Sequence, residues 1–389
     1  MDRRSPASHE YSGFEQGPIR PPSEARSLLV RITRNCPWNR CSFCPVYKTE
    51  RFSVRPADHV KRDIDLVFKH TEALKRHIGE TGRITPQVVR RAGEDVPANE
   101  WDAFNAAVNW VIAGDMRSVF LQDADSLVTK PEELAGILTH LRTRFPSIRR
   151  ITTYARAKTV YKRKDADLRA VRDAGLNRIH IGLESGSDEV LGMVVKGSTK
   201  AVQIEAGLKV KRAGMELSEY VIPGLGGRTL SRSHARETAD ALNRIDPDFI
   251  RIRSLAIPPH APLYQQWRSG DFEKCTDLMV AEELLLFVEM LHGITSVVKS
   301  DHILNLFMDL EGRLPGDTER LAEIPRAFLA MEPDEQRLFQ VGRRLNIFHG
   351  SKDLRNPRKR EMAEKMVAEL GVTAENIDDI TDRLMTRFV

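Results

Sequence analysis

The chain has 389 residues, of which 41% are hydrophobic and 30% are charged. This composition supports a sizeable buried core and excludes a chain that is disordered throughout. The formal net charge of +5 allows an anionic partner without requiring one. The apolar runs are far shorter than the roughly 18 residues of a membrane span, and residues 1–26 hold no apolar signal segment. We therefore expect a cytoplasmic globular protein without a membrane partner.

The first 26 residues carry four prolines and no hydrophobic periodicity, which predicts a flexible or draped N-terminal arm. The β-branched segment 27–33 predicts a first strand that leads directly into a loop with three cysteines. Residues 58–75 and 100–111 have helical character, and they flank a polar insertion with several glycines at 79–99.

From residue 117 onward, predicted strands and helices alternate. The strands are expected at 118–122, 151–156, 178–184, 217–222 and 249–255, and the helices at 134–145, 165–174, 201–213, 231–245 (with Ser231 as N-cap) and 277–291. Such alternation implies parallel crossovers, hence an open α/β sheet or a partial barrel over residues 27–294, with functional side chains at the carboxyl ends of the strands. Short helical patterns at 317–328, 333–345 and 360–370 then predict a helical C-terminal accessory region, residues 295–389.

Three of the four cysteines lie within nine residues, at Cys36, Cys41 and Cys44. Three thiolates on one loop can bind three irons of a four-iron cubane and leave the fourth iron open to another ligand. A zinc site would need a nearby fourth Cys or His, whereas Cys275 lies 231 residues beyond Cys44. The spacing C-x4-C-x2-C is also typical of two-iron plant-type ferredoxins, but the long chain and its βα units favour the four-iron site.

The cysteine loop, with Phe43 directly before its last cysteine, resembles the radical S-adenosylmethionine (radical SAM) superfamily. The resemblance covers about residues 27–310 and includes the segments RITRNCPWNRCSFCPVYKTERFSVRP, VFLQDADSL, IHIGLESGSDEVL, VIPGLGG and PPHAPLYQQWRSGDF. It implies a partial (β/α)6 TIM-like barrel and a [4Fe-4S] cluster held by the three cysteines, with S-adenosylmethionine (SAM) on the fourth iron. It also implies reductive cleavage of SAM to a 5′-deoxyadenosyl radical, and an electron donor such as flavodoxin or ferredoxin.

Two features depart from the superfamily pattern. The first cysteine gap has four residues rather than the commoner three, and a glycine-rich motif after the second strand is replaced by the segment 122–125, QDAD. Within that segment, Asp123 can accept hydrogen bonds from the SAM ammonium group or can close an Asx turn.

Further SAM contacts follow from the resemblance. It places Glu184 against the SAM ribose or amino acid, although a carboxylate there can also serve the N-terminus of the next helix. It places Phe43 beside the cluster and the segment from Ile222 to Gly224 against the adenine. Independently of the resemblance, the position of Arg156 after the third strand and the geometry of its guanidinium group predict bidentate binding of the SAM carboxylate.

In the last predicted strand, Ile250 and Ile252 alternate with Arg251 and Arg253. If the isoleucines face the helices, the guanidinium groups face the interior and need anionic partners, either on an anionic substrate or on the barrel wall. His302 is a candidate for substrate contact or proton transfer, or for a structural hydrogen bond.

The sequence thus predicts a radical SAM enzyme that acts on an unidentified small molecule, and the two arginines leave open whether that substrate is anionic. Two other functions stay open. One is radical SAM modification of RNA such as tRNA, favoured by the basic residues at 343–344 and 352–360, which no recognisable RNA-binding module accompanies. The other is a non-catalytic iron–sulfur electron carrier. Cys275 is expected to be a packed thiol rather than a radical quencher.

Overall fold

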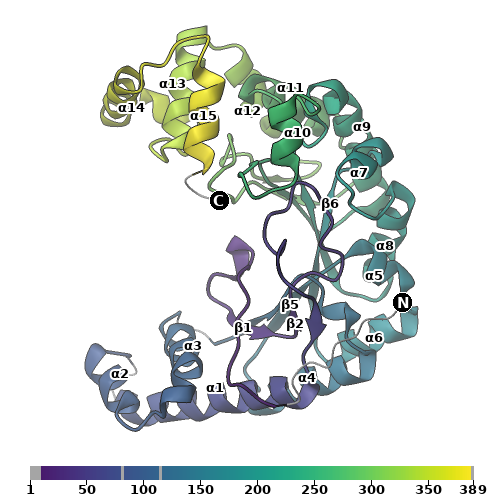
Figure 1. Cartoon of the computed structure of the whole chain (residues 1–389), viewed down its shortest axis with the longest axis vertical. Coiled ribbons are helices and arrows are strands. Elements are labelled where there is room, and N and C mark those ends of the chain that lie inside the picture. The colour runs from purple at the N-terminus through teal and green to yellow at the C-terminus, as the bar shows by residue number, and fades with distance from the viewer. Residues whose placement is uncertain (1–9, 80–82, 114–115, 387–389) are drawn as a thin grey trace. The chain divides into compact units, whose positions relative to one another are not determined.

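The computed structural model describes residues 10–79, 83–113 and 116–386 (Figure 1). The chain divides into two compact units. Unit 1 consists of residues 1–37, 49–180 and 209–216, and unit 2 consists of residues 38–48, 181–208 and 217–389. The three predicted cluster cysteines are therefore divided between them, with Cys36 in unit 1 and both Cys41 and Cys44 in unit 2.

An eight-stranded sheet has the strand order β1-β4-β5-β6-β7-β8-β9-β10. Its strands are β1 Leu28–Arg31, β4 Ser118–Gln122, β5 Arg150–Ala155, β6 Arg178–Glu184, β7 Glu216–Val221, β8 Phe249–Ile252, β9 Val297–Lys299 and β10 Gly312–Arg313. β1, β4 and β5 pair in parallel, as do β7, β8 and β9, whereas β10 is antiparallel to β9. The mixed α/β class with a mostly parallel, TIM-like sheet is thus confirmed. The predicted last strand ends at Ile252, so Arg253 lies just beyond it.

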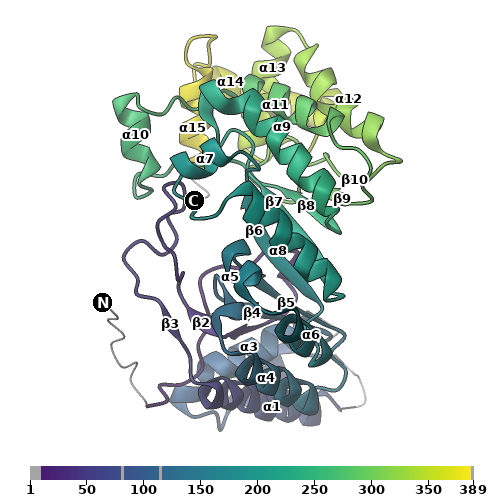
Figure 2. The ribbon, with the colours of Figure 1, turned by 90° about the vertical axis from the view of Figure 1, so that its right-hand side faces the viewer.

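The described residues of unit 1 form long and short helices around β1, β4 and β5 and against one another. These helices are α1 Ala57–Ile78, α2 Pro86–Gly93, α3 Trp101–Ile112, α4 Pro131–Arg144, α5 Ala157–Lys162 and α6 Asp165–Asp173, with 3-10 turns at Pro22–Glu24, Ala98–Glu100 and Ser126–Val128 and a small hairpin of β2 Thr33–Arg34 and β3 Ser53–Val54. α1 buries Val60, Ile64 and Val67 at helical spacing, and it packs against α3 and α4 (Figures 1 and 2).

Helix α2 lies inside the segment that was predicted as a polar insertion. It forms because Thr85 caps it by accepting a hydrogen bond from the amide of Val88, and because Pro86 suits the first helical turn. Residues 80–82 of that segment lie outside the described residues, as do residues 1–9 of the predicted arm.

The described part of the arm is held against unit 1. The Tyr11 hydroxyl donates to Asp63 (2.7 Å), and the Gln122 side chain accepts from the amide of Gly17 (2.9 Å) and donates to the carbonyl of Ile19 (2.8 Å). Phe14 is also buried. Residues 11–19 therefore contribute buried contacts around the end of β4.

Unit 2 carries the remaining helices and the C-terminal region. They are α7 Asp188–Met193, α9 Gly227–Ile245, α10 Leu263–Ser269, α11 Asp277–Glu289, α12 Thr318–Leu329, α13 Pro333–Arg344, α14 Pro357–Glu369 and α15 Ile377–Met385, with a 3-10 turn at Ser351–Arg355, while α8 Lys200–Arg212 has residues in both units. The C-terminal helices share an aromatic core in which Phe307 packs against Phe328 and Phe339 stacks on Phe348. Among the described residues, none of the helices has the length and apolar character needed to cross a membrane.

The predicted cap at Ser231 is wrong. α9 begins four residues earlier, at Gly227, and the Ser231 hydroxyl instead donates to Glu283 on α11 (2.5 Å). A buried acceptor on another helix therefore determines how this serine is used.

Candidate radical SAM site

In unit 1, the backbone before Cys36 is held by a buried carboxylate. Asp123 is fully buried, and its Oδ2 accepts from Nε of Arg31 (2.8 Å) and from the backbone amide of Asn35 (3.2 Å). The Asn35 side chain donates to the carbonyl of Arg51 (2.6 Å). These bonds hold the backbone of Asn35 at a φ of 67°, in the left-handed region that residues other than glycine seldom adopt. Asp123 thus positions the residue that precedes Cys36, and its predicted contact with SAM stays a prediction.

In unit 2, the backbone around Cys41 and Cys44 is held by hydrogen bonds to three segments. The amide of Ser42 donates to the carbonyl of Val194 (3.0 Å), and the carbonyl of Ser42 accepts from the amide of Leu263 (2.9 Å). Nζ of Lys48 donates to the carbonyl of Cys41 (2.7 Å). The second part of the cysteine loop is therefore fastened to the end of α7 and the start of α10.

Aromatic side chains complete this attachment. Phe43 packs against an apolar cluster that includes Val194 and Ile222. Trp38 donates to the carbonyl of Val195 (2.8 Å), and its ring occupies the space beside Gly197, where an added Cβ would lie 2.4 Å from it. Because Gly197 also has a φ of 71°, both backbone conformation and available space require glycine there.

The donor set of the loop fits an iron–sulfur cluster. Cys36, Cys41 and Cys44 are half-buried thiols and are not joined in a disulfide. Within the described residues, no three His, Cys, Asp or Glu side chains converge on the position of a single metal ion. A cubane has a different requirement, because each of three thiolates binds its own iron.

Glu184 lies at the end of β6, beside the attached cysteine loop. Its Oε1 accepts from Nζ of Lys196 (2.9 Å), and that ammonium group lies 5.9 Å from the centre of the Phe43 ring. An added Cβ on Gly182 would lie 2.0 Å from the Glu184 carboxylate, so the absent side chain makes room for this pair. Ser187, rather than Glu184, caps α7 by accepting a hydrogen bond from the amide of Val190. Lys196 is a site residue that sequence reasoning missed.

A buried ion pair connects the two segments expected to contact SAM. Oε1 of Glu283 accepts from the amide of Gly224 (2.8 Å) and pairs with Nδ1 of His234 (2.8 Å), while Nε2 of His234 donates to the carbonyl of Glu184 (3.2 Å). Burial disfavours the charged imidazole, but the Glu283 carboxylate outweighs that effect and raises the pKa of His234. The sequence offered one signal for this network, a carboxylate within the apolar run of α11.

A second buried carboxyl lies close to Glu184. Glu219 on β7 is fully buried, and neither of its carboxyl oxygens has a hydrogen-bond partner among the described residues. Burial and the nearby Glu184 charge raise its pKa well above the ordinary value.

The two predicted interior arginines share one protein carboxylate. Arg251 donates to Oδ2 of Asp301, and Arg253 donates to Oδ1 of the same residue (3.0 Å). Burial opposes the charge on Asp301, but the two guanidinium groups lower its pKa overall. Asp301 thus balances one of the two positive charges, and Nη2 of Arg253 is buried without a hydrogen-bond partner among the described residues. Burial and Arg253 together lower the pKa of His302 to about 4, so its imidazole is neutral at physiological pH and is a weak base.

Arg156 lies in unit 1, directly before α5. Together with Lys158, Lys162 and Arg163 it lines a shallow cavity of about 310 Å³. The neighbouring Asp125 is fully buried, which raises its pKa to about 7. Unit 1 therefore holds Cys36, Asp123 and Arg156, whereas unit 2 holds the other predicted site residues and brings Phe43, Glu184, Ile222 and Gly224 into one connected network.

Comparison with known proteins agrees with this reading of the loop and the sheet. Residues 30–241, more than half of the chain, match the radical SAM superfamily. The chain belongs to that superfamily and is an enzyme of the radical SAM class. The superfamily implies SAM and a [4Fe-4S] cluster as cofactors, and its members need an electron donor and a substrate.

Individual relatives are distant. The tRNA uridine(34) acetyltransferase of Methanocaldococcus infernus is 24% identical over 101 residues, which cover 25% of this chain and 19% of that protein. Coproporphyrinogen III oxidase (HemN) from Escherichia coli has a TM-score of 0.44 at 15% identity, over 68% of this chain and 52% of that chain. Methylornithine synthase (PylB) has a TM-score of 0.43 at 12% identity, over 76% and 68% respectively. The chain thus spans about a fifth of the curated relative and about half of the HemN chain.

Proposed function

We propose that this protein cleaves SAM reductively at a [4Fe-4S] cluster held by Cys36, Cys41 and Cys44, and that the resulting radical abstracts hydrogen from a substrate. The observation that carries the proposal is a loop of three cysteines, none of them in a disulfide, within the region that matches the radical SAM superfamily. When bound, the reduced cluster supplies the electron that breaks SAM into methionine and the 5′-deoxyadenosyl radical.

The protein's own residues would bind and orient SAM. Glu184 offers carboxylate oxygens to ribose hydroxyl groups, and Lys196 forms an ion pair with that carboxylate. Ile222 offers an apolar surface to the adenine, and the amide of Gly224 is held in place by Glu283. The Glu283–His234 pair supports both segments, which favours a fixed distance between the ribose and adenine contacts.

Two residues have a less direct basis. Arg156 is proposed for the SAM carboxylate only because its guanidinium group directly follows β5 and can bind a carboxylate in bidentate fashion. Asp123 already accepts two hydrogen bonds from protein groups, so we favour a positioning role for it at Cys36 over contact with the SAM ammonium.

The test is anaerobic reconstitution with iron and sulfide, followed by dithionite reduction in the presence of SAM. We expect four irons per chain and the formation of 5′-deoxyadenosine. Two irons per chain, or an intact four-iron protein that forms no 5′-deoxyadenosine, would contradict the proposal. Flavodoxin or ferredoxin should replace dithionite as the electron donor.

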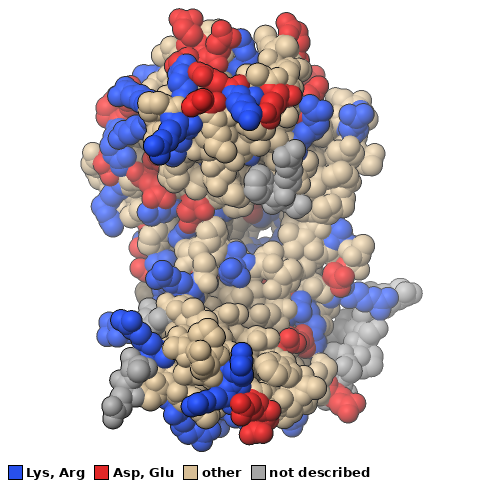
Figure 3. All heavy atoms as spheres, turned by 90° about the vertical axis from the view of Figure 1, so that its left-hand side faces the viewer, with Lys and Arg blue, Asp and Glu red and all other residues tan. Residues whose placement is uncertain are grey.

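RNA modification is a weaker candidate, because the basic residues that favoured it are largely used within the fold. Arg343 is buried and donates to the carbonyls of Leu306 (3.1 Å) and Asn305 (2.7 Å), and Arg344 pairs with Asp277. Lys359 and Arg360 also form ion pairs with carboxylates. Acidic and basic side chains are interspersed on the face shown in Figure 3. A small-molecule substrate is therefore proposed, and tRNA binding with a steep salt dependence would argue for RNA instead.

A further inference from the structure

The ends of three neighbouring strands in unit 2 connect Arg253 with the segments proposed for SAM. The backbone amide of Arg253 donates to the carbonyl of Val221 (2.8 Å), and the amide of Ile222 donates to the carbonyl of Glu184 (3.1 Å). β8, β7 and β6 therefore end next to one another. In parallel α/β folds, ligands bind at the carboxyl ends of the strands. A ligand held by Arg253 would thus lie one strand away from the proposed adenine contact.

The arginine pair, Arg251 and Arg253, lies on the face of the sheet that carries Ser218 and Tyr220. Nε of Arg251 donates to Oγ of Ser218 (3.1 Å), and the guanidinium of Arg253 lies 4.5 Å from the centre of the Tyr220 ring. Residues two apart along a strand share one face, which both β7 contacts obey. The two guanidinium groups are therefore neighbours on one side of the sheet.

The arginine pair carries one more positive charge than the protein offsets. In the part of the chain that the structure describes, Asp301 is the only carboxylate that forms an ion pair with either arginine. Burial is the main cause that lowers the pKa of His302, and Arg253 lowers it by more than Asp301 raises it. The potential at the imidazole is therefore positive, in agreement with the count of charges.

A buried hydrogen-bond donor of Arg253 has no acceptor. Nη1 of Arg253 donates to Oδ1 of Asp301 (3.0 Å) and to the carbonyl of Ile252 (2.8 Å), whereas Nη2 is buried and has no partner among the described residues. A buried donor that makes no hydrogen bond costs free energy, and a buried charge without a partner costs more. An anion bound at Arg253 would remove both costs.

Solvent reaches this cluster at Arg253. The exposed fraction of the side chain is 14% for Arg253 and 24% for Asp301, against 5% for Arg251. The segment that carries Asp301 is fixed to β8, because Nδ2 of Asn305 donates to the carbonyl of Ile252 (3.0 Å). Arg251 and Asp301 thus form a covered ion pair of fixed position, and Arg253 is the cation that a ligand can approach.

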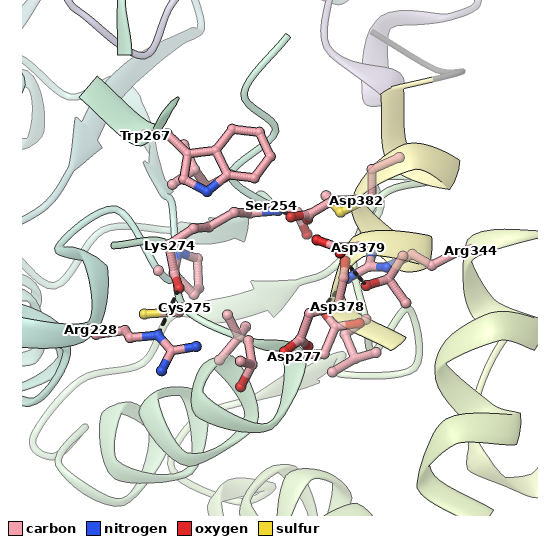
Figure 4. Close-up of a pocket in the computed structure, with 18 of the residues that line it drawn as sticks. Arg228, Ser254, Trp267, Lys274, Cys275, Asp277, Arg344, Asp378, Asp379 and Asp382 are labelled. Atoms are coloured by element: carbon pink, nitrogen blue, oxygen red, sulfur yellow. Dashed lines mark hydrogen bonds and ion pairs between the residues drawn. The ribbon is translucent and has the colours of Figure 1, made fainter. Parts of the chain in front are cut away.

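Cations elsewhere in unit 2 have carboxylates of their own. A cavity of about 300 Å³ is lined by Ser254 after β8 (Figure 4). In its lining, Lys274 forms an ion pair with Asp382, and Arg344 forms one with Asp277. The uncompensated positive charge therefore distinguishes the arginine pair from these one-to-one ion pairs.

The size of the charge excess favours a carboxylate as the missing anion. Two guanidinium groups and one carboxylate leave a single positive charge, and His302 is neutral at physiological pH. A carboxylate supplies one negative charge and two oxygens that match the planar guanidinium. A phosphate monoester carries almost two negative charges at pH 7 and would replace the positive excess by a negative one.

We propose that the substrate carries a carboxylate group, which Arg253 binds beside the ion pair of Arg251 with Asp301. This proposal rests on the proposed radical SAM function for its catalytic meaning. The bound carboxylate would fix one end of the substrate next to the strand ends that hold SAM, which is how a remote charged group orients a reacting centre.

Three probes that share a benzene ring test the charge preference: benzoate, benzamide and phenyl phosphate. Their binding to the reconstituted, unreduced protein with SAM is measured by isothermal titration calorimetry. We expect benzoate to bind at least tenfold more tightly than benzamide, since a guanidinium–carboxylate hydrogen bond is charge-assisted, and more tightly than phenyl phosphate. No binding of benzoate, or equal or tighter binding of either other probe, overturns the proposal.

SAM has a carboxylate of its own, so the benzoate titration is repeated without SAM. An unchanged affinity for benzoate is expected, because the proposed site belongs to the substrate. Competition between SAM and benzoate would assign the arginine pair to SAM and overturn the proposal.

Arg253→Gln should abolish the preference for benzoate. It leaves Arg251 and Asp301 as a balanced pair, so we expect the variant to fold. Arg178→Gln is the control, because that guanidinium is similarly buried and pairs with a carboxylate of its own, Glu216; it should preserve the preference. Should the melting temperature of Arg253→Gln fall by more than about 5 °C, Arg251→Gln serves instead, since it also leaves one cation for Asp301. A preference that survives in the folded variant contradicts the proposed location.

Formation of 5′-deoxyadenosine after dithionite reduction is measured on the same preparations. If that product is absent while the benzoate preference holds, the radical SAM proposal fails and the carboxylate site stands. If 5′-deoxyadenosine forms but no benzoate preference exists, the carboxylate site alone fails.

Discussion

The two ends of the cysteine loop are held by different kinds of interaction. Before Cys36, in unit 1, a buried carboxylate joins Arg31 and the amide of Asn35. Around Cys41 and Cys44, in unit 2, backbone hydrogen bonds and the packing of Phe43 hold the chain. Removing one partner of a buried ion pair leaves an uncompensated charge, whereas truncating an apolar side chain removes only part of its contacts. A single substitution before Cys36 should therefore lower the free energy of unfolding more than a truncation of Phe43 does.

The largest effect should come from replacing the three cysteines proposed as cluster ligands. Their loss should have the same consequence at both ends of the loop. Cys36→Ala, Cys41→Ala and Cys44→Ala should each abolish the brown chromophore after reconstitution, because three thiolates are the minimum set for a cubane with one open iron. Cys275→Ala should keep the full absorbance and iron content. Retention of four irons by any one of the three variants would contradict the ligand assignment.

Asp123→Ala tests the contact of Asp123 with Arg31 and with the amide of Asn35, before Cys36. We expect a loss of about 3–5 kcal/mol in the free energy of unfolding, measured by urea denaturation of the apoprotein, because Arg31 loses its buried partner. Arg31→Ala should cost a similar amount, and the double variant should cost much less than the sum. If Asp123 served only SAM, the stability of the apoprotein would not change.

Phe43→Ala tests the packing of Phe43 against the apolar cluster of unit 2. The ring is partly buried, so we expect a loss of about 2 kcal/mol in the same measurement, with Phe43→Leu costing about half as much. Iron content after reconstitution should fall less than in Asp123→Ala. A larger loss in Phe43→Ala than in Asp123→Ala would reverse the comparison.

The buried His234–Glu283 pair of unit 2 should make the stability of the protein depend on pH. The folded protein holds the pKa of His234 above its ordinary value of about 6.5, so the native state binds the proton more tightly than the unfolded state. The resulting stabilisation is fully present below the unfolded pKa and is lost as pH rises through the folded pKa. Urea unfolding from pH 5.5 to 8.5 should therefore show the stability advantage over Glu283→Gln shrinking as pH rises. A difference that does not vary with pH would argue against the charged pair.

The smallest effect concerns Cys275. Burial and the neighbouring Glu283 raise the pKa of its thiol to about 12, so its thiolate fraction at pH 8 is very small. In the native apoprotein, iodoacetamide should alkylate Cys275 at least tenfold more slowly than an unstructured cysteine peptide, as followed by mass spectrometry. Labelling at the peptide's rate would show that the thiol is exposed.

Local sequence patterns were sufficient to predict the positions of several strands. Strands such as Ser118–Gln122 and Arg178–Glu184 lie where they were predicted, because short β-branched segments between helical patterns have few alternatives. β9 and β10 were missed, since two or three residues carry no periodicity. The start of α9 was also misplaced, because the partner of Ser231 lies 52 residues away on another helix.

What the sequence determined by itself was the cysteine loop, because covalent spacing alone keeps three thiols within nine residues. It also limited Arg251 and Arg253 to one face of a strand. Only the tertiary structure decided which carboxylate pairs with these arginines, and that Asp123 holds the residue before Cys36. Each of these contacts joins residues about 50 or more positions apart, and the interactions between such groups depend on distance in space rather than on distance along the chain.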